Sequence, residues 1–216
     1  MKIIFNHLSY GNGKRSFKIA SFYKRMFGLD SHIALTLCYV YSQLELNEQF
    51  NKQVELTEKY FENTGYINGI RAENLARQKK INEAITALDI AIEENPNESV
   101  FYNNRGYYKS KIEKYRDALL DFEKAIALNP KDYFALNNQG YSKFKSLDKS
   151  GIEDITLSLK KCPNNSVALK NLALIEIERN NYKKARKLLD KAKRKKFYYQ
   201  VCKEIAEIEK KMPNNG

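Results

Sequence analysis

The sequence predicts an all-α fold of stacked, antiparallel helix pairs, and three observations favour it. The first is a repeat, in which Ala84, Leu88, Ala91 and Pro96 stand 34 residues before Ala118, Phe122, Ala125 and Pro130. The second is composition, since 43% hydrophobic and 12% aromatic residues are enough to bury a core. The third is that nine glycines and four prolines fall mostly at the ends of expected helices, which argues against a sheet protein or a low-complexity chain.

Residues 99–132 carry the repeat most completely, and their pattern predicts a helix, a tight turn and a second helix. Gly106 lets the first helix approach the second where Ala118 faces it, and Ala125 admits the next helix pair. Pro130 ends the second helix and begins a turn. Because neighbouring stretches copy this spacing, the fold is expected to grow by stacking and to need no single central core.

This pattern resembles the tetratricopeptide repeat, whose 34-residue signature places Trp, Leu, Gly and Tyr on the first helix and Ala, Phe and Pro on or after the second. Residues 99–132 keep the Gly, both Ala, the Phe and the Pro. Tyr102 replaces the Trp, while Arg105 and Lys109 depart from the apolar Leu and Tyr. The resemblance implies a right-handed α-solenoid of antiparallel helix pairs with capping helices at its ends. It also implies that the first helix of each pair lines the inner surface.

The N-terminal segments fit this plan less closely. Residues 1–30 are expected to form a loop and a capping helix, because apolar side chains recur at helical spacing over 14–27 and Gly28 follows them. Residues 31–64 are expected to form a degenerate helix pair that begins near Ser31. The small residues of the signature are missing there, although Cys38 could serve as one.

Four repeats are expected between residues 65 and 198, over the ranges 65–98, 99–132, 133–165 and 166–198. The third is one residue short, and the deficit best fits the turn near 148–150. With that shift Gly151, Ile155 and Ser158 take the places of Ala118, Phe122 and Ala125. Residues 199–216 are expected to form a solvating C-terminal helix and a tail, because an apolar stripe faces charges on the other sides.

Composition also bears on the cellular setting. The first residues are too briefly apolar for a signal peptide, and no run of about 18 apolar residues follows that could span a membrane. The three cysteines are an odd number and widely separated in the sequence. Together these features predict a reducing, cytoplasmic setting.

The most promising candidate site is a row of side-chain amides on successive first helices. Asn104, Asn138 and Asn171 are 34 and 33 residues apart. An amide both donates and accepts hydrogen bonds, so such a row could hold the main chain of an extended peptide without demanding its sequence. The predicted partner-binding residues are Asn103, Asn104, Tyr107, Asn137, Asn138, Tyr141, Phe144, Lys170, Asn171 and Leu174.

The amides have a structural alternative, in which they hold adjacent helices together. The sequence leaves the two roles open. One specific binding mode is disfavoured: family members that clamp the acidic tails of heat-shock chaperones carry Lys and Asn on one first helix and Lys and Arg on a later one. Here these places are taken by Gly69, Glu73, Phe134 and Asn138.

A basic patch near the C-terminus is the second candidate site. The formal net charge of +12 is concentrated at the two ends, and residues 179–216 hold thirteen basic residues against four acidic ones. RNA, DNA or an acidic protein could bind there, or the lysines could simply be a solvated helix face. The patch consists of Arg186, Lys187, Lys191, Lys193, Arg194, Lys195 and Lys196.

No pattern predicts an enzyme, a metal site or a cofactor. A phosphate-binding loop would need Gly where Leu8 stands and Ser or Thr where Arg15 follows Lys14. His7 and His32 are 25 residues apart, and neither stands at ligand spacing from a Cys or a carboxylate pair. The hypothesis of an enzyme would be kept only if residues 1–64 held a different fold and bound a nucleotide.

The sequence therefore predicts a non-catalytic module that binds a protein or an extended peptide on the first-helix surface. It could act as a scaffold, as an adaptor, or as a dedicated inhibitor or chaperone of one cognate protein. The alternative is nucleic-acid or acidic-partner binding at the basic patch. The partner and the oligomeric state are not determined by the sequence.

Overall fold

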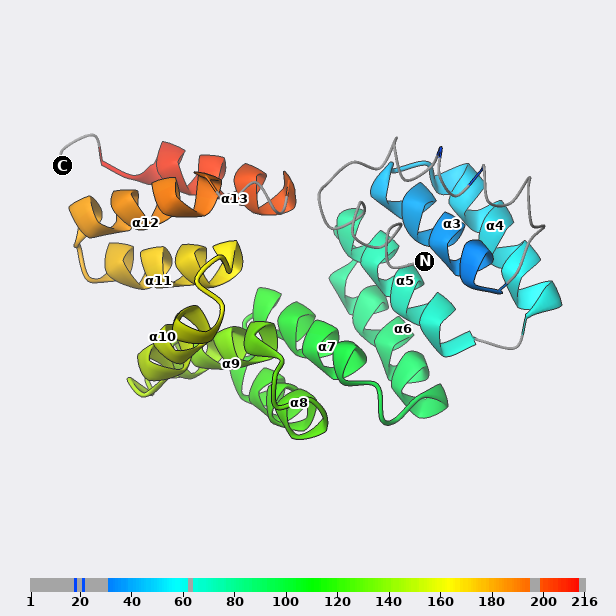
Figure 1. Ribbon diagram of the computed structural model, residues 1–216, viewed down its shortest axis with the longest axis horizontal. Helices are drawn as coiled ribbons and strands as arrows, with labels where there is room; N and C mark the ends of the chain where they lie inside the picture. Colours follow the sequence, from blue (N-terminus) through cyan, green and yellow to red (C-terminus); the bar gives the residue numbers. More distant parts are fainter. Residues whose placement is uncertain (1–17, 19–20, 22–30, 62–63, 195–198, 214–216) are drawn as a thin grey trace. The chain divides into compact units, whose positions relative to one another are not determined.

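A computed structural model of the chain describes residues 18, 21, 31–61, 64–194 and 199–213, and over these residues every regular element is an α-helix (Figure 1). The helices are α3 (Ser31–Gln43), α4 (Asn47–Tyr60), α5 (Thr64–Arg77), α6 (Ile81–Glu94), α7 (Ser99–Lys111), α8 (Tyr115–Leu128), α9 (Tyr133–Lys145), α10 (Gly151–Lys161), α11 (Ser166–Glu178), α12 (Tyr182–Arg194) and α13 (Tyr199–Lys211). The predicted all-α fold is thus confirmed for the part described. The capping helix expected over 14–27 lies outside the described residues, apart from positions 18 and 21. The segment compared with a phosphate-binding loop, residues 8–15, also lies outside them. None of the described helices is long and apolar enough to cross a membrane.

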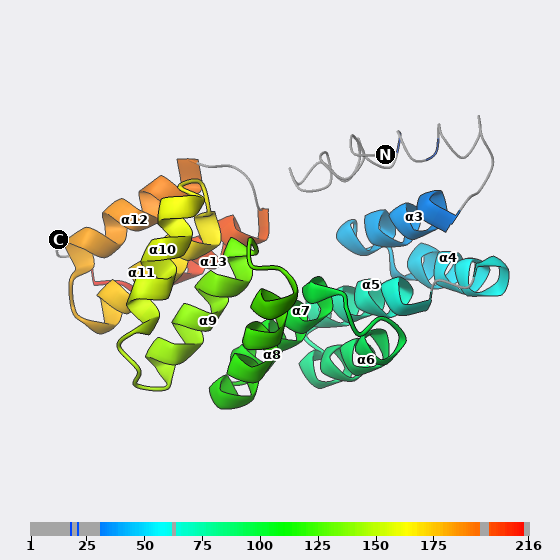
Figure 2. The same ribbon diagram turned by 60° about the horizontal axis from the view of Figure 1, so that its bottom comes forward.

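The chain divides into two compact units, Met1–Tyr108 and Lys109–Gly216. In the first unit α3 packs on α4, and α5 packs on α6. In the second unit α9 packs on both α8 and α10, and α11 packs on α12 and α13 (Figures 1 and 2). The division falls near the end of α7, inside the stretch 99–132. The units are therefore larger than one repeat, and the proposed repeat boundaries remain a prediction.

Each helix pair turns through one left-handed residue. Among the described residues five non-glycine residues have a positive φ, and they are Glu45, Lys79, Glu113, Leu147 and Asn180. The intervals between them are 34, 34, 34 and 33 residues. In each turn the N–H of the next residue donates to a carbonyl five residues back, as Lys80 does to Leu75 at 3.0 Å. This is the Schellman termination of a helix. Glu45 keeps the same interval, so residues 31–64 share the turn geometry although they lack the small residues of the signature.

The structure also places the one-residue deficit of the third repeat. The left-handed residues Glu113 and Leu147 are still 34 apart. The buried residues of the following helices are 33 apart, since Ala118, Phe122 and Ala125 of α8 correspond to Gly151, Ile155 and Ser158 of α10. The missing residue therefore lies between Leu147 and Gly151, at the turn where the sequence predicts it.

Two glycines bring α9 and α10 into backbone contact. A Cβ added to Gly140 would meet the Gly151 carbonyl oxygen and lie 2.9 Å from Ile155 Cγ1. A Cβ added to Gly151 would in turn meet the Gly140 carbonyl oxygen and the backbone nitrogen of Phe144 at 2.8 Å. Close approach of two helices thus explains the small residue that the signature places on each of them. Ile155 is fully buried beside this contact and belongs to the core that joins α10 to α11.

We expect Gly140→Ala to destabilise the second unit. At an ordinary helical site this change would stabilise the helix by about 1 kcal/mol. Here the new methyl group overlaps the α10 backbone, and such overpacking costs roughly 1–3 kcal/mol. Urea unfolding followed by circular dichroism should show a lower midpoint. Glu153→Ala, at an exposed site on α10, is the control that should leave the midpoint nearly unchanged. A Gly140→Ala protein as stable as wild type would contradict the close-packing account.

We expect Leu147→Asn to stabilise the protein. Leu147 has φ 69° and is 92% exposed, so its side chain gains little from burial while the left-handed backbone is strained. Left-handed backbone costs an L-residue about 1–2 kcal/mol, and Asn, which already occupies the equivalent position 180, tolerates it better. Thermal unfolding should show a rise of roughly 2–4 °C for about 1 kcal/mol. Leu120→Asn, also at an exposed leucine but inside α8, should give no rise.

Candidate protein-binding surface

The predicted amide row is divided between the two units. Asn103, Asn104 and Tyr107 lie on the part of α7 that belongs to the first unit, and all three are partly buried. The Tyr107 ring lies 5.6 Å from that of Tyr108 and packs against the core made with α5 and α6. Burial raises the pKa of the Tyr108 hydroxyl. The remaining predicted residues belong to the second unit.

In the second unit the amides bind one another. Asn137 is fully buried, and its amide nitrogen donates to the Asn138 side-chain oxygen at 3.1 Å. The buried Asn171 donates to the Asn137 side-chain oxygen at 3.3 Å and so connects α11 to α9. A buried amide without partners would destabilise the fold, so this pairing stabilises the two helices against each other. The geometry of Asn137 and Asn171 thus matches the structural alternative.

Lys170 is also engaged inside the unit. It is only 5% exposed, and its ammonium group lies 2.5 Å from a carboxylate oxygen of Glu204 on α13. Lys111 reaches the other oxygen of Glu204 at 3.2 Å. Burial lowers the pKa of Lys170. Desolvation alone would raise the pKa of Glu204, but the two ammonium groups hold it below its usual value. Lys170 therefore anchors α13 to α11.

Four predicted residues of the second unit stay partly exposed: Asn138, Tyr141, Phe144 and Leu174. Together with Lys145 and Glu178 they form what we call the α9–α11 face, because α9 and α11 pack against each other. Lys145 donates to Glu178 at 2.9 Å and so crosses from α9 to α11. The Arg179 guanidinium lies 5.9 Å from the centre of the Phe144 ring. Burial raises the pKa of the Tyr141 hydroxyl, to which Lys145 lies close enough to oppose that rise.

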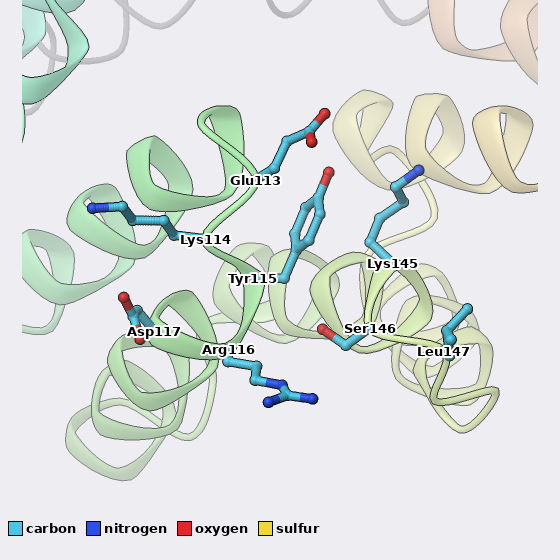
Figure 3. A pocket seen from close by; sticks show the side chains of 8 residues that line it. All are labelled: Glu113, Lys114, Tyr115, Arg116, Asp117, Lys145, Ser146 and Leu147. Atoms are coloured by element: carbon cyan, nitrogen blue, oxygen red, sulfur yellow. The ribbon is translucent and has the colours of Figure 1, made fainter.

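A hollow of about 460 Å³ adjoins this face where α8 begins and α9 ends. Its lining is Glu113, Lys114, Tyr115, Arg116, Asp117, Lys145, Ser146 and Leu147. In Figure 3 the Tyr115 hydroxyl and the Lys145 ammonium group project to the same side of the hollow, whereas Arg116 projects to the other. Partial burial raises the pKa of Tyr115. The sequence analysis missed these residues, and the only signal was the 34-residue interval that brings Glu113 and Leu147 to equivalent turns.

The structure describes five residues of the predicted basic patch; Lys195 and Lys196 lie outside the described residues. Arg186 donates to the Pro213 carbonyl oxygen at 2.6 Å, and Lys193 pairs with Glu209 at 2.5 Å. Lys187, Lys191 and Arg194 are exposed. Lys183, which the sequence analysis did not include, is exposed on the same side of α12, one turn before Lys187.

Reactive groups are few in the part of the chain that the structure describes. No group of three His, Cys, Asp or Glu side chains there could hold a metal ion. Cys38 is buried against Thr57, and burial raises its pKa to about 11, which leaves the thiol protonated and unreactive. Cys162 is partly buried at the end of α10.

Several solved structures share this fold. No protein-family model and no curated protein matches the sequence. Among solved structures, the APC/C hetero-tetramer Cut9–Hcn1 aligns with a TM-score of 0.75 at 16% identity, over 97% of this chain and 42% of that one. PilF of Pseudomonas aeruginosa aligns with a TM-score of 0.63 at 15% identity, over 83% of this chain and 84% of that one. YrrB, described as a TPR protein with an unusual peptide-binding site, aligns with a TM-score of 0.54 at 14% identity, over 88% and 97%.

These similarities establish the class of fold. The chain has the all-α, tetratricopeptide-repeat-like fold that the small residues of the repeat predict. Identities of 14 to 16% support the fold and carry no partner or role with them.

The Lys170–Glu204 pair gives a test of how α13 is held. We expect Lys170→Met to destabilise the second unit by about 3 kcal/mol, because it removes one partner of a buried ion pair. The double variant Lys170→Met/Glu204→Met should recover most of that loss, since two apolar side chains leave no buried charge. Urea unfolding of the four proteins in this cycle measures the coupling. If the double variant loses as much stability as the two single variants together, the pair does not act as a unit.

The same pair predicts a pH dependence. The pKa of Glu204 is lower in the folded protein than in the unfolded chain, so its contribution is present at neutral pH and is lost as the pH falls through the folded value. Glu204→Gln should therefore flatten the acid side of a plot of unfolding midpoint against pH. An unchanged acid limb would contradict this assignment.

Proposed function

We propose that this chain is a non-catalytic protein-binding repeat module whose α9–α11 face holds an extended segment of a partner protein. The observation that supports it is the partial exposure of Tyr141, Phe144 and Leu174 on two neighbouring first helices. The buried faces of α9 and α11 are already covered, because α9 packs on α8 and α10, and α11 packs on α12. Aromatic and aliphatic side chains of this kind contribute most to affinity when a protein partner buries them.

The polar groups on this face suit a main-chain ligand. Asn138 lies beside Tyr141 on α9, and the Lys145–Glu178 pair connects the two helices. Amides, hydroxyls and charged groups can donate to or accept from the backbone of an extended peptide, while the apolar residues contact its side chains. The hollow beside Lys145 could take a larger side chain of the same ligand.

The biological form of such binding would be that of a scaffold, an adaptor, or a dedicated inhibitor or chaperone of one cognate protein. Two neighbours in fold are described with partners or peptides, YrrB by its peptide-binding site and Cut9 by its hetero-tetramer with Hcn1. Both neighbours support the general proposal that this chain binds protein. A second candidate function, binding of an anionic partner at the basic patch, is supported by the exposed cations of α12.

A displayed library of random peptides tests the first proposal. Peptides selected on the full-length protein should lose at least tenfold in affinity for the Leu174→Glu variant, because the new carboxylate places charge where an apolar contact is expected. Leu157→Glu is the control, since Leu157 is an exposed leucine on α10, outside the α9–α11 face. Calorimetric titration gives both affinities. If selected peptides tolerate Leu174→Glu, or lose equally with Leu157→Glu, the proposed face is wrong.

A further inference from the structure

Helix α12 has two opposite faces of different character. Ala185, Leu189 and Ala192 are buried in the core of the second unit. On the other side lies what we call the basic stripe, which consists of Lys183, Lys187, Lys191 and Arg194. The steps along it are four, four and three residues, which keep the side chains on one face of a helix. Each four-residue step rises about 6 Å, so the stripe is roughly 16 Å long.

The basic stripe is exposed and is not neutralised within the described part of the chain. No carboxylate there lies within salt-bridge distance of Lys183, Lys187, Lys191 or Arg194, in contrast to two other lysines on the same helix. Lys184 pairs with Glu176 at 2.8 Å, and Lys193 pairs with Glu209 at 2.5 Å. Asp190 is the one acidic residue of α12 and is exposed on the same face, three residues after Lys187, so this face carries four basic residues against one acidic residue. This separates the predicted patch into engaged cations and available ones.

The chemistry of the stripe discriminates between two kinds of anionic partner. An exposed lysine paired with a single carboxylate gains only about 0–1 kcal/mol, because water screens the pair and the long side chain loses freedom. Four such pairs would hold an acidic peptide weakly. A nucleic acid carries a condensed layer of counterions, and each phosphate that a lysine neutralises releases one of them. Exposed lysines in a row therefore favour a partner with a continuous phosphate backbone.

Other features of α12 fit a backbone contact without base reading. The apolar side of the helix is buried in the core, so it can neither insert between bases nor enter a lipid layer. Three of the four residues are lysines, which bind phosphate as point charges.

We infer that the basic stripe of α12 binds the phosphate backbone of a nucleic acid, without preference for sequence. This rests on the second candidate function, an anionic partner at the basic patch, and narrows it to nucleic acid at four residues. It does not depend on the α9–α11 face, and one protein can carry both surfaces.

Fluorescence anisotropy of a labelled 20-base-pair DNA duplex and of a 20-nucleotide RNA, titrated with the full-length protein, tests the inference. The logarithm of the binding constant should fall with the logarithm of salt concentration at a slope of about −3 to −4, for up to four phosphates contacted. Lys187→Gln/Lys191→Gln should weaken binding at least tenfold at low salt and reduce the slope by about 2.

The matched control is Lys124→Gln/Lys131→Gln, which removes the same charge from exposed sites on α8 and the turn after it. It should change affinity less than threefold. Equal loss in the two double variants would overturn the stripe, since net charge alone would then explain binding. Circular dichroism of all variants should be unchanged, because the substituted side chains are exposed.

Two further probes separate the sources of negative charge. If a polyglutamate peptide or phosphatidylserine vesicles bind through the stripe while DNA and RNA do not, the nucleic-acid inference is overturned and the anionic-partner function stands. If none of these probes binds at 50 mM salt, both are overturned. The peptide-library experiment on Leu174 is unaffected by either result, so failure of the two proposed surfaces can be told apart.

Discussion

The closeness of paired helices is the constraint on which this structure depends. Two helices can bring their backbones close together only where the facing residues are small, and in α9 and α10 both facing residues are glycines, Gly140 and Gly151. The left-handed residue Leu147 lies in the turn that connects these two helices. The third repeat is one residue short, and the shortening lies within the turn. Both the Schellman hydrogen bonds and the buried positions of α10 are therefore kept. The array therefore tolerates a change in repeat length between the turn residue and the glycine, where little is packed.

Polar groups inside the second unit serve two purposes that the primary structure alone does not distinguish. Asn137, Asn171 and Lys170 face neighbouring helices and satisfy one another or Glu204. Asn138 and the partly exposed residues beside it remain at the surface. Asn137 and Asn138 are neighbours on α9, and the rotation of about 100° between them decides which one is buried and which one stays at the surface. The predicted amide row is thus partly an internal tie between α9 and α11, and the binding surface we propose is the portion that the tie leaves uncovered.

Charge on α12 shows the same separation. The helix carries seven basic residues, yet Lys184, Arg186 and Lys193 are committed to carboxylates or to a carbonyl of their own unit. Pairing fixes these side chains in place, whereas the stripe on the far side remains hydrated and free to neutralise a partner. Counting lysines along the chain overstates the available patch and misses Lys183, because availability depends on which acidic side chains the fold brings near.

The sequence by itself determined the helix pairs, their interval and the place of the shortened turn. These depend on local spacing and on residue size, as Gly140, Gly151 and the Ala and Phe of residues 99–132 illustrate, and such signals survive in a linear chain. Only the tertiary structure decided that Lys170 is buried beside Glu204, that Asn137 binds Asn171, and that Tyr115, Lys145 and Leu147 surround one hollow. Each of these depends on side chains far apart in the sequence meeting at a particular rotation of their helices, and no local pattern encodes that meeting.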